Sequence, residues 1–474
     1  MSSAVEKLTP QVTESAEDPM GAIARFIVNT RYEDLDSAVI EKAKIRLMDA
    51  VASVIAGTSF EGSQEVVDFV TEQGGKDEST IPVFGNKVPA SAAGFAMGYM
   101  ARARDIGTVA EHHAVGHVGE FIFPAMLPVA ESKRTSGREF LLAWILGKEI
   151  LTRLGKAECH KIYFTSYGHY SWYVIWGVTA AVARLLGLDV EKTWNAMGIA
   201  YQQVSGEEQS FLDGALSVKL IHSWRAQSAI NCALLAQKGF TGPRRVLCGK
   251  NGYFTRFVPP QCEADLTWIT SNLGKEWIGL DSSIKPYPSC KCTHAAAAGV
   301  VKLMKEHNIK LENIREIDLG LHPTCYTIVC TPPARKYDPQ TVTDAQFSAP
   351  YVTAVAAIKG SVSFEDFSTE ARQRSDVRAL MRRIKLHEDP GLGFKETVVR
   401  IMTGRGEVFQ ERVNFVKGHP FNPMSWEEEI AKFRGCVAVA AKPFGSSRVE
   451  EMIDALREIE KIDDMRKVAQ LLVP

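Results

Sequence analysis

The first half of the chain repeats apolar residues with the period of an α-helix. Over residues 38–56, apolar side chains recur three and four positions apart, with Asp36 before them and Gly57 after them as start and stop signals. Ser136-Gly-Arg-Glu139 has the form of a capping box ahead of a helix over 140–154. Further helices are predicted over 19–31, 62–74, 91–103, 172–186 and 216–238. This pattern predicts a compact helical bundle.

Strand-like alternation begins only after about residue 275. Residues 316–321 alternate polar and apolar positions, and the runs 396–402 and 407–413 flank Thr403-Gly-Arg-Gly406 as a predicted hairpin. Helical segments recur around these strands, over 295–306, 350–359, 369–384, 425–434 and 447–459. The sequence therefore predicts a mainly α protein, with a large helical bundle domain plus a smaller α+β domain.

The change of pattern also predicts the domain boundaries. Residues 1–18 form a flexible N-terminal segment, 19–275 the helical domain and 276–415 the smaller α+β domain. The helices predicted within 416–474 return to the helical domain, so the smaller domain is expected to be an insertion.

Charge and composition narrow the classes of ligand. Lys plus Arg total 55 against 56 Asp plus Glu, so no basic field would attract nucleic acid. The polar segment Met1–Asp18 does not resemble a secretory signal, and the longest apolar stretch, Tyr173–Ala183, is too short to span a bilayer. We expect a small-molecule ligand, with neither nucleic acid nor membrane as a partner.

The nine cysteines indicate a reducing compartment, because their number is odd and they are scattered along a long chain. The cytoplasm is the expected location. Neither Cys290-Lys-Cys292 nor the pair Cys325 and Cys330 has the spacing of a zinc or iron–sulfur site. We predict no metal and no cofactor.

The segment Ile284–His294 is the strongest candidate for a binding site. Its two prolines exclude a simple helix, so Lys285 and Cys290 are presented from a stiff, irregular loop. A run of small residues from Ala295 predicts a helix that begins after Thr293 as its cap. Because a helix N-terminus favours anions, this segment indicates a carboxylate ligand.

Several motifs in one order resemble the 2-methylcitrate dehydratase family, also called MmgE/PrpD, from about Ala22 to Phe433. Besides 284–294, they are Asp344-Ala-Gln-Phe-Ser-Ala-Pro-Tyr351, Gly418-His-Pro-Phe-Asn-Pro-Met424 with Lys432-Phe433, Val218-Lys-Leu-Ile-His222 with Arg225-Ala226, and Thr241-Gly-Pro243. The resemblance implies a helical domain with a smaller lid domain, a homodimer and catalysis without a metal.

The resemblance also implies which residues form the site. Asp105-Ile-Gly-Thr108, followed by His117 and by Pro124 seven residues later, resembles the family's aspartate-rich motif and its catalytic histidine. The family commonly has further acidic residues directly after the position of Asp105, and this chain does not. Three nearby residues are candidate replacements, which would alter the substrate or the reaction: Glu111, His112 and His113. Tyr167-Gly-His169 resembles a second histidine motif, with Tyr170 and Trp172 as specificity determinants.

Proton transfer beside a carboxylate needs an imidazole and nearby cations. We predict His117, His169, Lys219, Tyr351 and Asp105 as catalytic residues, and Lys285, Arg225, His222, Cys290 and Tyr170 as substrate-binding residues. Lys219 and His222 stand one helical turn apart on one face. Cys290 is also compatible with a small buried residue, and nucleophilic catalysis through it is disfavoured because nothing suggests a thioester or amide substrate.

The resulting hypothesis is a lyase that acts on a small di- or tricarboxylic acid, as a hydratase or dehydratase of the 2-methylcitrate dehydratase type. The resemblance equally covers cis-aconitate decarboxylases and an epimerase of iminodisuccinate. A catalytically inactive binding or regulatory homologue is the alternative from a different class, because the aspartate motif is disrupted.

Overall fold

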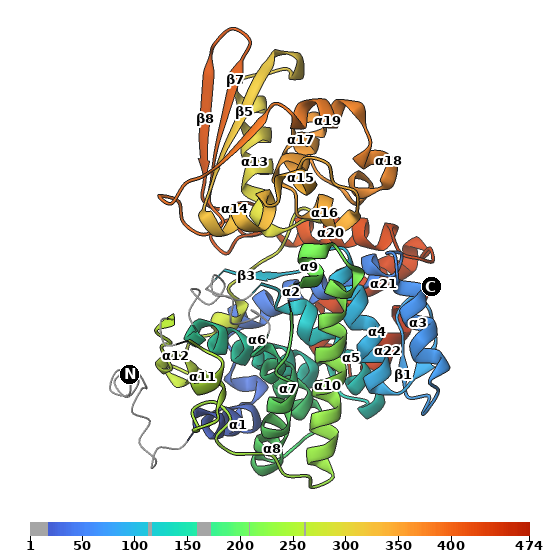
Figure 1. The fold of residues 1–474 in the computed structure, drawn as a ribbon. Coiled ribbons are helices and arrows are strands. Elements are labelled where there is room, and N and C mark those ends of the chain that lie inside the picture. Colours follow the sequence, from blue (N-terminus) through green and yellow to red (C-terminus); the bar gives the residue numbers. More distant parts are fainter. Residues whose placement is uncertain (1–17, 112–115, 159–171, 208, 260–261) are drawn as a thin grey trace, which may run out of the picture.

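A large helical domain and a smaller α+β domain meet along one boundary (Figure 1). The computed structural model describes residues 18–111, 116–158, 172–207, 209–259 and 262–474. This combination of a helical domain and a smaller α+β domain confirms the predicted fold class. Within the described ranges, no helix is both long enough and apolar enough to cross a membrane.

The helical domain is built around six long helices. They are α2 (Ser37–Gly57), α4 (Ala90–Ala103), α5 (Gly119–Lys133), α6 (Gly137–Glu158), α7 (Val174–Leu185) and α10 (Leu220–Gln237). The small residues of α4 let it lie directly against α10. A Cβ atom at Gly98 would lie 2.5 Å from the backbone nitrogen of Ser223, so glycine is required at this crossing.

Shorter helices cover this core, and two of them match the helices predicted over 19–31 and 62–74. They are α1 (Pro19–Asn29), α3 (Ser63–Glu72), α8 (Val190–Ala200), α9 (Gln209–Asp213), α11 (Tyr253–Arg256) and α12 (Thr267–Thr270). Two strands, β1 (Ser79–Thr80) and β2 (Lys87–Val88), form a small antiparallel pair. The Asp18 carboxylate caps α1 through the amide of Met20, which fixes where the domain begins.

The smaller domain has a four-stranded sheet with the order β6-β5-β7-β8. Its strands are β5 (Ile314–Leu321), β6 (Ile384–Glu388), β7 (Thr397–Thr403) and β8 (Val408–Val413). Helices α13 (Lys291–Glu306) and α17 (Ala349–Lys359) lie on the same side of this sheet (Figure 1). Ile317, Val399 and Ile401 are fully buried there, so this face forms a second core.

Two predictions in this domain are wrong. The helix predicted over 369–384 is two short helices, α18 (Thr369–Arg372) and α19 (Ser375–Met381), and the chain then enters β6, which pairs in parallel with β5. The helix predicted to start after Thr293 is α13, which begins at Lys291 with Cys290 as its N-cap. The Thr293 hydroxyl donates to the carbonyl of Cys290 instead of capping the helix.

The other short helices of the smaller domain are α14 (Pro323–Cys330), α15 (Pro333–Lys336) and α16 (Val342–Gln346).

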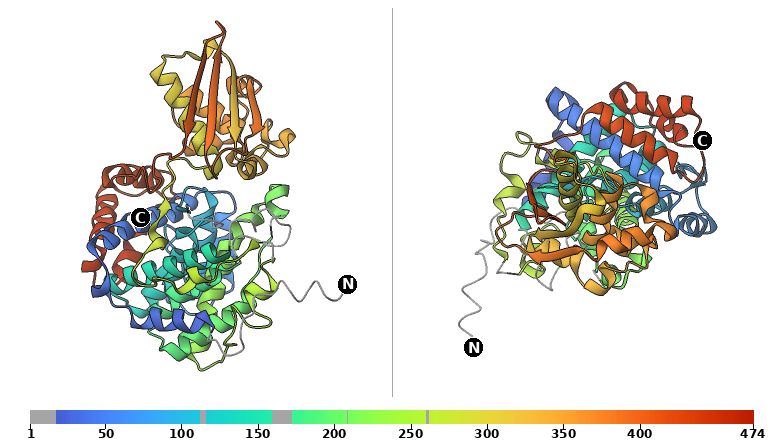
Figure 2. Two further views of the ribbon diagram at one scale, coloured as in Figure 1. Left: turned by 90° about the vertical axis from the view of Figure 1, so that its left-hand side faces the viewer. Right: turned by 90° about the horizontal axis from the view of Figure 1, so that it is seen from above.

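The chain returns to the helical domain after β8. Helices α20 (Trp426–Ala438) and α21 (Ser446–Arg457) lie beside α2, and α22 (Arg466–Leu471) packs against α5 and α21 (Figures 1 and 2). Phe433, Met452 and Leu456 are buried in the same core as the helices of the first half. The smaller domain is thus held at both of its ends by the helical domain.

Candidate active site

Buried charged residues gather where the helical domain faces the smaller domain. Asp105 follows α4, His117 and Glu120 stand at the start of α5, and Lys219 and His222 lie at the start of α10. Lys285 comes from the linker after β4 (Ser282–Ser283). These six side chains converge from segments far apart in the sequence, and each is at least nine-tenths buried.

A short hairpin positions His117. Strand β3 (Val109–Ala110) pairs antiparallel with β4, and Val109 also forms a bridge with His117. The amide of Ala110 donates to the carbonyl of Gly116 at 2.9 Å. The backbone therefore ties the histidine to the same strand pair that precedes Lys285.

Asp105 is the most strongly charge-stabilised carboxylate of this cluster. The Lys285 ammonium donates to its Oδ1 at 2.9 Å and to its carbonyl oxygen at 2.9 Å, and the Arg102 guanidinium also contacts Oδ1. Burial alone would raise the pKa of Asp105, but Lys285 and Arg102 outweigh it and hold the pKa well below its usual range. Asp105 stays ionised and has a left-handed backbone, with φ 52°.

His117 lies between two carboxylates. Its Nδ1 is 2.6 Å from Glu120 Oε2, and its Nε2 is 3.4 Å from Asp105 Oδ1. Burial and the Arg102 charge lower the pKa of His117 to about 4, although Glu120 opposes this shift. The imidazole is therefore neutral near pH 7, and either carboxylate can stabilise the charge that it gains on accepting a proton.

Glu120 was not singled out from the sequence, although it stands three residues after His117 in the motif. Its other oxygen, Oε1, accepts a hydrogen bond from the amide of Gly107 at 2.8 Å. Burial raises the pKa of Glu120, but the neighbouring His117 lowers it by more, so the net shift is downward. A Cβ atom at Gly107 would lie 2.4 Å from Oε1, so no acidic side chain fits at this position. Glu120 supplies a carboxylate here from α5.

Lys219 and His222 complete the cluster from α10. Lys219 Nζ donates to Gln346 Oε1 at 3.1 Å, and burial together with the Arg102 charge lowers its pKa to about 7. The His222 ring stacks on Phe121 at 3.6 Å and its Nε2 is 3.6 Å from Glu120 Oε2. Lys219 can therefore exchange a proton near neutral pH, whereas burial keeps the pKa of His222 well below its usual value.

Helix α20 supports the loop that carries Asp105. The Lys432 ammonium donates to the carbonyl of Ile106 at 3.0 Å and also contacts the carboxylate of Asp49. Both Lys432 and Asp49 are buried. The C-terminal helices thus stabilise the backbone next to the catalytic candidates.

Three predicted site residues are held by other contacts. Arg225 donates through NH1 to the carbonyl of Gln203 at 2.9 Å and to Ser205 Oγ at 3.1 Å, so it braces a loop of the helical domain. Tyr351 is fully buried in the core of the smaller domain, and its hydroxyl donates to the carbonyl of Asp366. Cys290 occupies the N-cap position of α13 without a side-chain capping bond, and a hydrogen bond with Cys292, together with burial, raises the pKa of its thiol well above the usual value. Asp105 also raises this pKa, so Cys290 lies close to the cluster.

The remaining candidates either lie outside the described residues or make contacts away from the Asp105 cluster. His112, His113, His169 and Tyr170 lie outside the described residues. Trp172 donates its indole N–H to the carbonyl of Gly206 at 3.3 Å and packs edge-on against Phe257. Glu111 binds Lys395 instead of joining the Asp105 cluster.

His117, Glu120 and His222 offer metal-type donor atoms that lie within 4.8 Å of one another. Two imidazoles and one carboxylate can hold a divalent cation by donor type. Arg102 and Lys285 lower the pKa values of His117 and Glu120, and Arg102 and Lys219 lower that of His222, so all three cations act on this triad. A further dication is disfavoured by that charge, and an anion is favoured.

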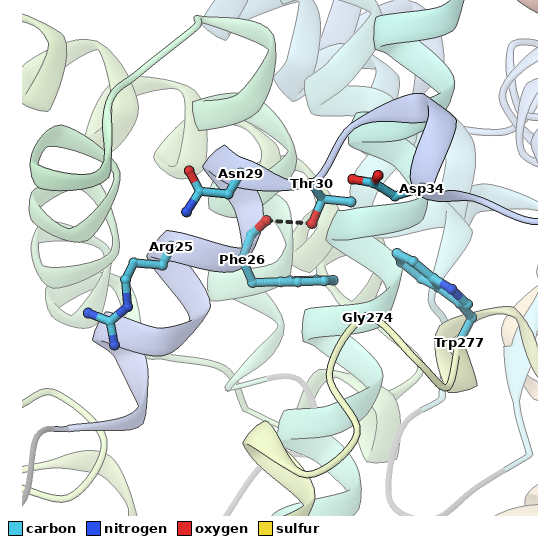
Figure 3. A pocket seen from close by; sticks show the side chains of 7 residues that line it. All are labelled: Arg25, Phe26, Asn29, Thr30, Asp34, Gly274 and Trp277. Carbon is cyan, nitrogen blue, oxygen red and sulfur yellow. Dashed lines mark hydrogen bonds between the residues drawn. The ribbon is translucent and has the colours of Figure 1, made fainter.

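A pocket at the C-terminal end of α1 differs from the Asp105 cluster in the residues that line it (Figure 3). It has a volume of about 390 Å³ and lies between the end of α1 and residues 274–277. Its lining includes Arg25, Asp34 and Trp277, and the Thr30 hydroxyl donates to the carbonyl of Phe26 at 2.7 Å. None of the described residues that line it carries an imidazole, so it is a weaker candidate for proton-transfer chemistry than the Asp105 cluster.

Comparison with known proteins gives matches along nearly the whole chain. The MmgE/PrpD N-terminal domain matches residues 21–263 and the MmgE/PrpD C-terminal domain matches residues 287–458. The cis-aconitate decarboxylase-like protein oryM of Aspergillus oryzae is 24% identical over an alignment 492 positions long that covers 98% of each chain. A cis-aconitate decarboxylase of Aspergillus terreus is 25% identical over an alignment 481 positions long that covers 95% of each chain. A cis-aconitate decarboxylase of Mus musculus is 24% identical over 95% of this chain and 92% of its own.

Proposed function

Because the chain belongs to the MmgE/PrpD family, we propose that it is a lyase that decarboxylates a small unsaturated tricarboxylate of the cis-aconitate type. The observation that carries this proposal is the cluster around Asp105, in which a neutral imidazole lies among three buried cations. Full-length similarity to cis-aconitate decarboxylases supports decarboxylation as the first reaction to test.

Substrate binding is expected to be driven by charge. Lys219, Lys285 and Arg102 face a space whose fixed carboxylates are Asp105 and Glu120. A trianionic substrate would lose its hydration water on binding and would contact these cations instead. Its charge would also raise the pKa values of His117 and Lys219, which are depressed in its absence. Binding therefore prepares the site to donate a proton.

The chemical step then has a simple balance. The bond between a methylene carbon and its carboxylate breaks and carbon dioxide leaves. The electron pair of that bond forms a new double bond to the neighbouring carbon, and the π pair of the original double bond moves to the far carbon. That carbon receives one proton, which we assign to the His117 imidazolium held by Glu120, and solvent supplies the next proton to the imidazole. The cations stabilise the negative charge that spreads onto the neighbouring carboxylate.

Dehydration of a hydroxytricarboxylate is the second candidate. The pKa of about 4 for His117 and of about 7 for Lys219 give one group that accepts a proton and one that donates it. Such a pair could remove a proton beside a carboxylate and protonate a leaving hydroxide. Epimerisation would use the same abstraction and return the proton on the other face.

One experiment distinguishes these reactions. The purified protein is incubated in D₂O with cis-aconitate, citrate, 2-methylcitrate or iminodisuccinate, and products are followed by NMR and by release of carbon dioxide. Stoichiometric carbon dioxide with one deuterium in the product supports decarboxylation. Alkene formation from a hydroxy acid without carbon dioxide supports dehydration, and exchange without net reaction supports epimerisation. Neither turnover nor exchange with any acid would support an inactive binding homologue.

Three further expectations belong to the same proposal. Exhaustive chelation should leave turnover unchanged, because proton transfer here relies on imidazole and lysine groups. Light scattering should show a homodimer, as the family resemblance implies. Fractionation of cells should place the protein in the cytoplasm, the compartment that the cysteine content predicts.

A further inference from the structure

A second charged cavity lies at the boundary between the two domains. It has a volume of about 420 Å³, within the usual range for small-molecule pockets. Its lining includes Glu111 from the His117 hairpin, Lys291 from α13, and Lys395 from the loop before β7. None of the six clustered residues around Asp105 lines it, so it is distinct from the candidate active site.

Lys291 is the unusual residue of this cavity. It stands in the first turn of α13 with only 6% of its side chain exposed. Its ammonium is 3.7 Å from Glu111 Oε1 and has no hydrogen-bond partner in the described ranges of the chain. Burial lowers the pKa of Lys291 to about 8, so the group is still mostly charged at pH 7. A buried ammonium without hydrogen bonds is costly unless a ligand supplies the acceptors.

Lys395 adds a second ammonium beside the same carboxylate. Its Nζ donates to Glu111 Oε2 at 3.0 Å and to the carbonyl of Ala110 at 2.8 Å. Its backbone is left-handed, with φ 71°, a conformation that non-glycine residues rarely adopt. The loop holds this strained conformation with the ammonium against the hairpin, and such strain is typical of functional positions.

The other acidic groups of the cavity interact with cations outside it. Glu396 Oε2 accepts hydrogen bonds from Arg412 at 2.6 Å and from the amide of Gly393 at 3.0 Å. The charge of Asp281 acts on Arg46 and Lys148 and opposes the lowering of their pKa values by burial. Glu111 lies between Lys291 and Lys395, so these two cations exceed its charge by one, and Lys42 adds a further cation to the lining.

Aromatic rings form the outer wall. Phe394, Phe415 and Phe421 are 40%, 47% and 75% exposed, although each is large and apolar. The rings of Phe415 and Phe421 meet edge to face at 5.1 Å, and His419 lies 5.4 Å from Phe421. A ligand with an apolar body would bury this surface, at roughly 25 cal/mol for each Å² removed from water.

We propose that this cavity is a second ligand site, which binds an organic carboxylate through Lys291 and packs the apolar or aromatic body of that ligand against Phe394, Phe415 and Phe421. The site does not depend on the reaction that the Asp105 cluster performs. Because Glu111 precedes His117 by six residues in one hairpin, the ligand would sit next to the segment that carries the catalytic candidate.

The test uses 3-phenylpropionate as the probe, with binding to the full-length protein followed by calorimetry. Two matched compounds separate the contributions: propionate keeps the carboxylate without the ring, and 3-phenylpropanol keeps the ring without the charge. We expect 3-phenylpropionate to bind at least about tenfold more tightly than either, because each lacks one half of the recognition. Equal affinities for all three compounds, or no binding, would overturn the proposal.

Four variants locate the site. Lys291→Met should weaken binding about tenfold or more, and Phe421→Ala should weaken it severalfold. The controls are Lys302→Met, an exposed lysine on the same helix, and Phe69→Ala, an exposed ring on α3, and both should bind the probe as the native protein does. Should Lys291→Met fail to fold, Lys395→Met replaces it with the same expected loss.

A last variant distinguishes this site from the candidate active site. Lys219→Met removes a cation of the Asp105 cluster and should leave 3-phenylpropionate binding unchanged. Loss of binding in Lys219→Met with normal binding in Lys291→Met would place the probe at the cluster and would refute the second site. Since the readout is binding, this result is independent of whether the protein proves to be a decarboxylase.

Discussion

The hairpin that follows Val109 contributes to two sites that use the same residue types in different ways. Near Asp105, His117 joins lysine and carboxylate groups, and burial keeps that imidazole neutral at pH 7. Near Glu111, two lysines share one carboxylate, and His419 stays 4.0 Å from it. Cations can hold an anion, whereas proton transfer also needs a proton-carrying group within hydrogen-bond reach of its partner, as His117 is at 2.6 Å from Glu120 and His419 is not. The Asp105 cluster is therefore the candidate for catalysis, and the Glu111 cavity is a candidate for binding only.

The largest difference between the two sites should appear when a lysine is removed. Lys285→Met should lower kcat/KM by roughly 30-fold to several thousandfold, which corresponds to the roughly 2 to 5 kcal/mol lost when a buried charge pair is broken. The equivalent change in the other site, Lys395→Met, should alter kcat/KM by less than about threefold. Steady-state kinetics of both variants makes the comparison, and a similar loss in both would show that the two sites act as one.

Removing the carboxylate charge beside the His117 imidazole should have a smaller effect on turnover. Glu120→Gln keeps the shape of the side chain but removes the charge that stabilises protonated His117, so kcat should fall roughly 10- to 100-fold. Glu111→Gln is the matched change in the second site and should leave kcat within about threefold. Wild-type kcat in Glu120→Gln would mean that the contact at 2.6 Å only supports the fold.

The pH profile should show the same division. In the free enzyme, the proton that His117 donates is held below the pKa of His117, about 4, and the binding cation is present below the pKa of Lys219, about 7. A plot of log kcat/KM against pH should therefore be level below about 4, fall above about 4 and fall more steeply above about 7. Lys219→Arg should move the alkaline limb upward, because a guanidinium stays charged. If the limb remains near 7 in that variant, another group controls it.

The sequence predicted the helices well where one face is apolar, as the segment over 38–56 illustrates with α2 (Ser37–Gly57). It failed at β6, because five residues directly after a helix carry too little alternation to be recognised and their pairing partner, β5, is distant in the chain. The start of α13 was misplaced because Cys290, a weak capping residue, occupies the N-cap.

The site shows the same limit. The motifs predicted Asp105, His117, Lys219, His222 and Lys285, and the fold brings these five together. Tyr351 shares a motif with them, but its position on α17 directs it into the core of the smaller domain. Glu120 and Arg102 each stand three residues from a predicted residue, His117 and Asp105, and this spacing is a signal that could have revealed them. The sequence does not show, however, that the fold buries both pairs in one cluster.

The most direct test follows the proton to His117. The protein, His117→Gln and Glu111→Gln are each incubated with cis-aconitate in D₂O, and the rate of deuterium incorporation into the product is measured by NMR. We predict one deuterium per turnover in the native protein, a rate roughly 100- to 10,000-fold lower in His117→Gln, and a nearly native rate in Glu111→Gln. Incorporation at the native rate in His117→Gln would contradict the assignment of the Asp105 cluster as the catalytic site.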